Sequence, residues 1–266
     1  MSGLKVVDPA AQAEFTRRVR ILFPRSHQWE EHYVEHEMAH VRHLLVPGLC
    51  PVEGARALEF GCNIGATAVV LAHLGAQVTA ADVEPEFLEL AELNARRYGL
   101  SGRIRFEHIV PGGRLPLLDG SVGVITCNSV LEYVPHTQLR AALRELDRVL
   151  EPAGRLLVFG TSNRLWPREM HSRRWLTNYL PRWLDSRLRA PIQRGVWPWQ
   201  LRLAFPSYRD VLAGEGSAAY LRAKRRMGLR GPKRVALELL SGVMGMTGLS
   251  PGLLAPNITL LLEKPR

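Results

Sequence analysis

The sequence has few cysteines and no apolar run long enough to cross a bilayer. Cys50, Cys62 and Cys127 are scattered, odd in number and never in C-x-x-C spacing, which argues against a disulfide framework or a cysteine-based zinc site. A membrane-spanning helix needs about 18 or more apolar residues in succession, and the chain has no such run. No early stretch combines basic residues, an apolar run and a small-residue cleavage site. We therefore predict a cytoplasmic protein.

Positive charge, by contrast, is abundant and unevenly distributed. The formal net charge is +10, but seventeen lysines and arginines lie between residues 164 and 234 against only four acidic residues. The same segment holds five of the six tryptophans. Positive charge concentrated in this way indicates contact with an anionic partner. Three partners stay open: nucleic acid held through phosphates and stacking, an anionic membrane surface, or an acidic group on a small substrate.

Residues 36–40 read HEMAH and fit the H-E-x-x-H pattern of zinc proteases. The extended pattern would place glycine at position 43 and histidine at position 46, where this chain has His43 and Val46. Catalytic zinc also needs a third protein ligand besides water, and none is evident. We interpret the stretch as part of an N-terminal helix that caps the cleft. Two alternatives stay open: one of these histidines contacts the substrate, or the stretch binds a metal ion.

From residue 55 onward, short buried-strand patterns alternate with amphipathic helices, which predicts βαβ units and a parallel sheet. This alternation fails after residue 161, and a strand pattern returns only at residues 257–264. The predicted organisation is a helical cap (1–54), a cofactor-binding core (55–163), a basic insertion or substrate cap (164–250), and a C-terminal strand that completes the core (251–266).

The turn after the first predicted strand carries the most specific signal. That strand ends at Glu59, a turn with Gly61 and Gly65 follows, and about twenty residues later a second strand ends in Asp82. Such a unit binds the adenosine part of a cofactor at the carboxyl ends of the strands. The glycine spacing differs from the nicotinamide fingerprint, and no P-loop lysine follows. Glu59 suits a ligand with an ammonium group and no phosphate, which describes S-adenosylmethionine.

Residues 55–163 resemble the class I S-adenosylmethionine-dependent methyltransferases, especially the small-molecule type of quinone biosynthesis and sugar O-methylation. The stretches that carry the resemblance are LEFGCNIG, VTAAD, RLPLLDGSVGVITCNSVLEYVP and RVLEPAGRLLVFGT. The resemblance implies a Rossmann-like α/β sandwich with a mostly parallel seven-stranded sheet, and S-adenosyl-L-methionine as cofactor. The cofactor-binding residues that we predict are Glu59, Gly61, Cys62, Asn63, Gly65, Asp82, Val83, Val110, Asn128 and Ser129.

Two further features follow from the same comparison with the family. Glu132 falls in the region that lines the methyl-transfer face. Relatives often carry an acid near the end of the third strand to contact adenine, but this chain has Pro111 followed by two glycines. Backbone groups near Ile109 and Val110 are therefore expected to hold adenine.

Methyl transfer to an oxygen is helped by a base within hydrogen-bond reach of the acceptor hydroxyl. Tyr133 stands where many relatives have histidine, but tyrosine is a poor base at neutral pH. A loop after the fifth strand resembles an N-R-x-x-P-x-E-x-H stretch of relatives linked to glycan and lipid modification. We predict His171 of this loop as the base, oriented by Glu169. The alternative is an exposed loop whose Trp166 anchors the cap.

The expected function is methylation, at oxygen, of a small-molecule, glycan-type or lipid-linked acceptor, with peripheral contact to an anionic membrane surface. An RNA methyltransferase and a catalytically inactive cofactor-binding module are the alternatives. Against nucleic acid, the chain lacks the N-P-P-Y sequence of base-amino methylating relatives and the Pro-Cys nucleophile of cytosine C5 enzymes, since Cys127 lies in ITCNS. No metal is expected.

Overall fold

The computed structural model describes residues 4–187, 192, 194–213, 216–245 and 247–266. Arg189 and Glu215, which count toward the charge of the basic segment, lie outside these described residues. The N-terminal part forms α1 (Pro9–Leu22), α2 (His27–Glu31) and α3 (Tyr33–His40), followed by the short 3-10 helix η1 (Val41–His43). The predicted N-terminal helices are therefore present.

Seven strands form one sheet, as predicted. They are β1 (Arg56–Phe60), β2 (Gln77–Asp82), β3 (Ile104–His108), β4 (Val122–Asn128), β5 (Leu150–Ser162), β6 (Arg209–Asp210) and β7 (Asn257–Glu263). Their order is β3-β2-β1-β4-β5-β7-β6. The first five run parallel, whereas β7 pairs antiparallel with both β5 and β6. The two residues of β6 lie within the segment 164–250 and are too few to leave a strand pattern in the sequence.

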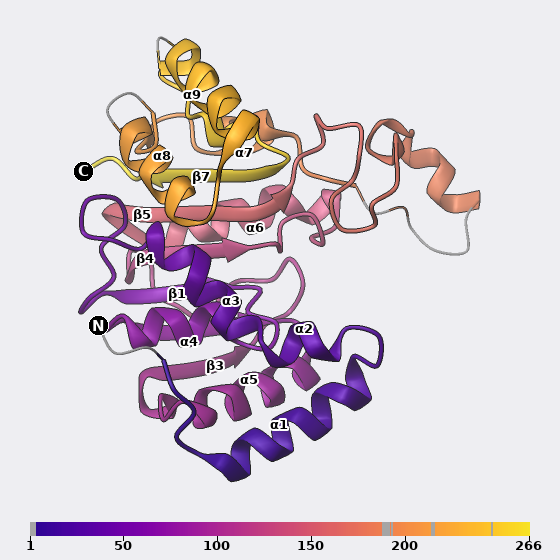
Figure 1. Cartoon of the computed structure of the whole chain (residues 1–266), viewed down its shortest axis with the longest axis vertical. Coiled ribbons are helices and arrows are strands. Elements are labelled where there is room, and N and C mark those ends of the chain that lie inside the picture. Colours follow the sequence, from indigo (N-terminus) through magenta and orange to yellow (C-terminus); the bar gives the residue numbers. More distant parts are fainter. Residues whose placement is uncertain (1–3, 188–191, 193, 214–215, 246) are drawn as a thin grey trace.

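Helices cover both faces of this sheet (Figure 1). The remaining α-helices are α4 (Ala66–His73), α5 (Pro85–Arg97), α6 (His136–Val149), α7 (Pro198–Ala204), α8 (Gly216–Arg226) and α9 (Gly231–Gly245). Buried residues of α3, α4, α5 and α8 share one apolar cluster with one sheet face, and those of α6 and α7 share another cluster with the opposite face. Short 3-10 helices occur at Ser101–Arg103 (η2), Thr177–Tyr179 (η3), Arg182–Arg187 (η4) and Pro251–Leu253 (η5).

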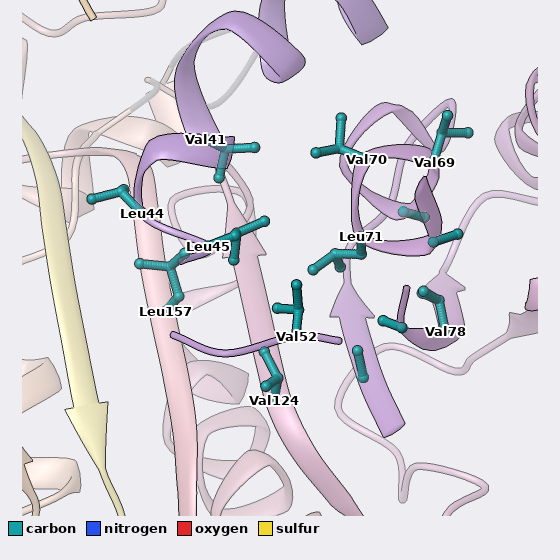
Figure 2. Packing of buried hydrophobic residues seen from close by; sticks show 14 of the residues in the cluster. Val41, Leu44, Leu45, Val52, Val69, Val70, Leu71, Val78, Val124 and Leu157 are labelled. Atoms are coloured by element: carbon teal, nitrogen blue, oxygen red, sulfur yellow. The ribbon is translucent and has the colours of Figure 1, made fainter. Parts of the chain in front are cut away.

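The segment after α3 is fixed to the sheet by apolar packing. Figure 2 shows Leu45 next to Leu157 of β5, and Val41, Leu44 and Val124 of β4 belong to the same cluster of buried residues. All five side chains are buried, and burying a side chain of this kind contributes about 1.5–3 kcal/mol. This packing holds α3 over the carboxyl end of the sheet, where the site lies.

Candidate active site

A cavity of about 870 Å³ lies at the carboxyl ends of β1, β2 and β4. Parallel strands bring their carboxyl ends to one edge of a sheet, which is where doubly wound folds bind ligands. Every predicted cofactor-binding residue except Gly65 contributes to the cavity wall. The predicted base His171 and Tyr133 line it as well, whereas Glu169 does not.

The glycine turn between β1 and α4 needs glycine at two positions. Gly61 has φ +72°, and a Cβ there would collide with Val130. Gly65 has φ +75°, and its Cβ would lie 2.8 Å from Cβ of Ala91 on α5. L-residues with side chains rarely adopt these φ values. Gly61 therefore shapes the wall itself, whereas Gly65 lets the start of α4 pack closely against α5.

Asp82 connects the end of β2 to this turn. Its Oδ2 accepts a hydrogen bond of 2.7 Å from the backbone N–H of Asn63, and its Oδ1 accepts one of 3.1 Å from the N–H of Glu84. A carboxylate offers about four acceptor positions, so two hydrogen bonds leave capacity for ribose hydroxyls. The geometry fits the predicted role of Asp82 toward adenosine.

The adenine end of the cavity has an apolar, backbone-rich wall. Ile109 through Gly113 and Leu115 line it. The N–H of Ile109 donates to the carbonyl of Asp82 at 2.9 Å, which ties β3 to β2 at the site. Recognition of adenine by the groups of Val110 stays a prediction.

The opposite end of the cavity is rich in hydrogen-bond acceptors. The Glu59 carboxyl is buried and accepts a hydrogen bond from the hydroxyl of Thr126. Burial raises the pKa of Glu59 well above its usual range, and the charges of Glu37 and Asp82 raise it further. No ion pair of Glu59 with lysine or arginine occurs among the described residues. A cationic ligand group would therefore be stabilised there.

The HEMAH stretch forms most of α3, and its histidines do not line this cavity. The rings of His36 and His40 stack with centroids 4.0 Å apart, and neither residue lines the cavity. Glu37 between them is turned inward and buried. In the part of the chain that the structure describes, no group of three or more histidine, cysteine, aspartate or glutamate residues is arranged to hold a metal ion.

His171 lies between two buried glutamates. Its Nδ1 is 3.3 Å from Oε1 of Glu169, and its Nε2 is 3.4 Å from Oε1 of Glu132. Both glutamate side chains are fully buried, whereas that of His171 is 29% exposed, at the cavity wall. The fold therefore brings together the predicted pair and adds Glu132 from the turn after β4.

The two carboxyl groups have opposite environments. Burial alone would raise the pKa of Glu169, but backbone N–H groups of Ser172 and His171 donate to the carboxylate, and the net effect lowers its pKa. Burial raises the pKa of Glu132, because the nearby His171 and the N–H of Ser162 compensate only partly. Oε2 of Glu132 has no hydrogen-bond partner among the described residues. Hydrogen bonds thus favour the ionised form of Glu169, whereas burial makes the charged form of Glu132 less favourable.

Tyr133 contacts the same histidine but is poorly suited to be a base. Its ring meets the His171 ring edge-on, with centroids 5.6 Å apart. Burial, together with the charges of Glu132 and Glu169, raises the pKa of Tyr133 to about 12. A phenol with this pKa stays protonated at neutral pH, so its role beside His171 is contact or hydrogen-bond donation.

The sequence analysis expected an N-terminal helix over the cleft but did not identify the residues that this part of the chain contributes to the cavity. Trp29, Glu30 and Tyr33 line it, although they lie before the core segment. It also placed Glu132 near the methyl-transfer face without identifying it as a partner of His171. Neither contact leaves a signal in the sequence, because each joins residues far apart along the chain.

Comparisons with known proteins agree with this geometry. Residues 58–158 match a family model described as a methyltransferase domain. Ubiquinone biosynthesis O-methyltransferase of Albidiferax ferrireducens is 30% identical over 168 residues, which cover 62% of this chain and 62% of that protein. The protein of the same name from Xanthomonas oryzae pv. oryzae is 34% identical over 131 residues, or 48% of this chain and 52% of that one. The chain thus spans less than two thirds of the length of these relatives.

A solved structure is also similar. It is a SAM dependent methyltransferase from Aquifex aeolicus, 17% identical, with a TM-score of 0.48 over 73% of this chain and 89% of that one. The family match covers the strands, the glycine turn and the acid that form the cofactor end of the cavity. Residues 58–158 are therefore similar to a methyltransferase domain over the part of the chain that holds the glycine turn and Asp82.

Proposed function

We propose that this protein is an O-methyltransferase that acts on a hydroxyl of a small-molecule, glycan-type or lipid-linked acceptor. The observation that carries the proposal is the position of His171 at the cavity wall, with a buried carboxyl group within 3.4 Å of each ring nitrogen. S-adenosylmethionine supplies the methyl group on a sulfonium, so the protein needs mainly to align the acceptor and remove its proton.

The proton of the acceptor hydroxyl has a direct path through His171. The Glu169 carboxylate accepts the Nδ1–H, which orients the ring and leaves the lone pair of Nε2 for the hydroxyl proton. Once protonated, Nε2–H lies 3.4 Å from Glu132, and the positive charge on His171 favours the ionised form of this carboxyl group, because it lowers the pKa of Glu132. His171 is the proposed base, Glu169 orients it, and Glu132 stabilises its charged form.

The size of the cavity and the names of the relatives support this choice of substrate. Pockets for small ligands measure about 300–1,000 Å³, so 870 Å³ leaves room for an acceptor beside the cofactor. The two relatives are named O-methyltransferases of ubiquinone biosynthesis. A small hydroxylated acceptor agrees with both observations.

An acceptor screen tests the proposal. Calorimetry with S-adenosylmethionine and its demethylated product comes first, followed by transfer of a labelled methyl group to hydroxylated aromatics, glycans, lipid-linked hydroxyls and RNA. We expect transfer to one of the first three classes. Transfer to RNA alone, with affinity that falls steeply as salt is added, would favour the RNA methyltransferase. Cofactor binding without transfer to any class would favour the inactive module.

We further propose that residues 164–187, here named the mouth segment, rest on an anionic membrane surface. Met170, His171 and Arg173 of this segment line the cavity, and the chain extends from the end of β5 away from the sheet (Figure 1). Exposed apolar side chains of the segment are Trp166, Trp175, Leu176, Tyr179 and Trp183. Exposed arginines are Arg168, Arg173, Arg174, Arg182 and Arg187.

This combination is typical of a protein that rests on lipid. Tryptophan and tyrosine prefer the level of the headgroups, and each arginine near an anionic surface contributes about 1 kcal/mol. No helix in the described ranges is both long and apolar enough to cross a bilayer. Contact through the mouth segment would let a lipid-linked acceptor enter the cavity from the membrane surface.

Vesicle binding checks the membrane contact. We expect the protein to sediment with vesicles of phosphatidylcholine and phosphatidylglycerol but not with phosphatidylcholine alone. Replacing Trp175 and Leu176 together by serine should weaken binding about tenfold or more, because both lose apolar contact with lipid. Leu118→Ser is the matched control, since Leu118 is 80% exposed but belongs to the core segment. Equal loss in the control, or no binding by the natural protein, would rule out this contact.

A further inference from the structure

The buried glutamate of the HEMAH stretch has no role in the chemistry proposed above. Glu37 is only 5% exposed, although it lies on the short helix α3 near the N-terminus. No ion pair with lysine or arginine is formed by Glu37 among the described residues. A buried carboxyl group without a cation is unfavourable unless a ligand or a proton compensates it. The burial of the Glu37 carboxyl group therefore needs a physical explanation.

Glu37 lies directly behind two side chains of the cavity wall. Tyr33 precedes Glu37 by one turn of α3. Burial raises the pKa of the Glu37 carboxyl group, and hydrogen bonding from Asn128 and Tyr33 lowers it. Asn128 Nδ2 also donates to the hydroxyl of Tyr33 at 3.3 Å and to that of Thr67 at 3.0 Å. Tyr33, Asn128 and Thr67 all line the cavity at the end where Glu59 lies. These three residues and Glu37 are here named the acceptor network.

The acceptor network concentrates negative charge. Burial raises the pKa of Tyr33 well above its usual range, and the charges of Glu37, Glu59 and Glu30 raise it further. Tyr33 therefore stays protonated and can donate its hydroxyl hydrogen to Glu37. A hydroxyl that donates to a carboxylate is polarised, and its oxygen becomes a better acceptor. That oxygen and the Glu59 carboxyl are then available to a cationic group in the cavity.

We propose that Glu37 is a positioning residue for the α-ammonium group of S-adenosylmethionine, acting through Tyr33 and Asn128 as the second carboxyl behind Glu59. The inference rests on the cofactor of the proposed function and not on His171 or on the acceptor. It gives α3 a function beyond covering the cleft, because the helix supplies half of the negative charge at the amino-acid end of the site. Glu37 of HEMAH then helps to bind an organic cation and not a metal ion.

Two ligands that differ only in the amino-acid tail test this inference. S-adenosylhomocysteine carries the ammonium group, whereas 5′-methylthioadenosine has the same adenosine and a thioether but no amino-acid tail. In calorimetry, Glu37→Gln should weaken binding of S-adenosylhomocysteine about tenfold, a typical loss for one nearby charge. Binding of 5′-methylthioadenosine should stay within about twofold of the natural protein.

Glu35→Gln is the matched control. Glu35 lies on the same helix and accepts a hydrogen bond of 2.9 Å from the hydroxyl of Tyr98, but it does not line the cavity. This variant should bind both ligands as the natural protein does. Thermal unfolding without ligand shows whether each variant folds; Glu37→Gln should not lower the melting temperature, because it removes a buried charge.

The pH dependence of binding is a second measurement that a merely structural role would not produce. Burial raises the pKa of Glu37 to about 7, although hydrogen bonds with Asn128 and Tyr33 lower it. The other titratable groups that act here are Tyr33, Glu30 and Glu59, with Asp82 acting on Glu59. Below pH 7 Glu37 is mostly neutral, and above it mostly charged. Affinity for S-adenosylhomocysteine should therefore rise from pH 6 to pH 8, and Glu37→Gln should flatten this rise.

The outcomes separate the inference from the proposed function. If Glu37→Gln lost affinity for both ligands equally, Glu37 would have a structural role and the inference would be overturned. Unchanged binding of S-adenosylhomocysteine would overturn it too. If the natural protein bound neither ligand, the cofactor site itself would be wrong. Absence of transfer to any acceptor would contradict only the proposed function, because these experiments need no acceptor.

Discussion

Replacing His171 by alanine is expected to lower the turnover of methyl transfer by about 10²- to 10⁴-fold, the usual contribution of a positioned general base. The affinity for S-adenosylmethionine should stay unchanged, because the side chain of His171 contacts Glu132, Glu169 and Tyr133 and not Asp82. Steady-state transfer of a labelled methyl group measures the first quantity, and calorimetry measures the second. The large effect follows from the loss of the only proposed acceptor for the hydroxyl proton.

His27→Ala is the control, since His27 is half-buried, lies 3.3 Å through Nδ1 from the carbonyl of Pro24, and does not line the cavity. Glu169→Gln should lower turnover less than His171→Ala, because an amide can still contact the imidazole but cannot stabilise its charged form. If His171→Ala transferred methyl groups at the rate of the natural protein, His171 would not be the base. A parallel loss of cofactor affinity would instead indicate that the loop had collapsed into the cavity.

Replacing Asp82 by alanine is expected to weaken binding of S-adenosylmethionine by about 1–3 kcal/mol, since buried ribose hydroxyls would lose their acceptor. At 25 °C this corresponds to a fall in affinity of about five- to 150-fold. The variant also leaves the N–H groups of Asn63 and Glu84 without their partner, so the glycine turn becomes less ordered. Calorimetry with the cofactor gives the magnitude.

Glu107→Ala provides a comparison. Glu107 lies on β3, next to β2, and pairs with Arg105 at 2.6 Å. It does not line the cavity. The variant should bind the cofactor normally. Thermal unfolding of both variants without ligand separates binding from folding. Unchanged affinity in Asp82→Ala would show that the ribose is held elsewhere, and the position of the adenosine would have to be revised.

Much of the fold could be predicted because its pattern is local. Strands buried on both faces read as continuous apolar runs, and the helices between them carry their own start and stop signals. The glycine turn was equally accessible, since two glycines between a strand and a helix are a local pattern. The neighbours that require Gly61 and Gly65, Val130 and Ala91, lie farther along the chain. The position of β6 could not be predicted, because its two residues are too few to give a periodic pattern.

The sequence by itself determined the α/β core, the cofactor class and the identity of the residues around the glycine turn, because these depend on periodicity and on spacing within about thirty residues. Only the tertiary structure decided that Glu132 stands opposite Glu169 on His171, and that Glu37 rather than a histidine of HEMAH is buried. The physical reason is the same in both cases. Which carboxyl groups become buried beside one another depends on how distant elements pack, and burial sets the protonation on which their chemistry depends.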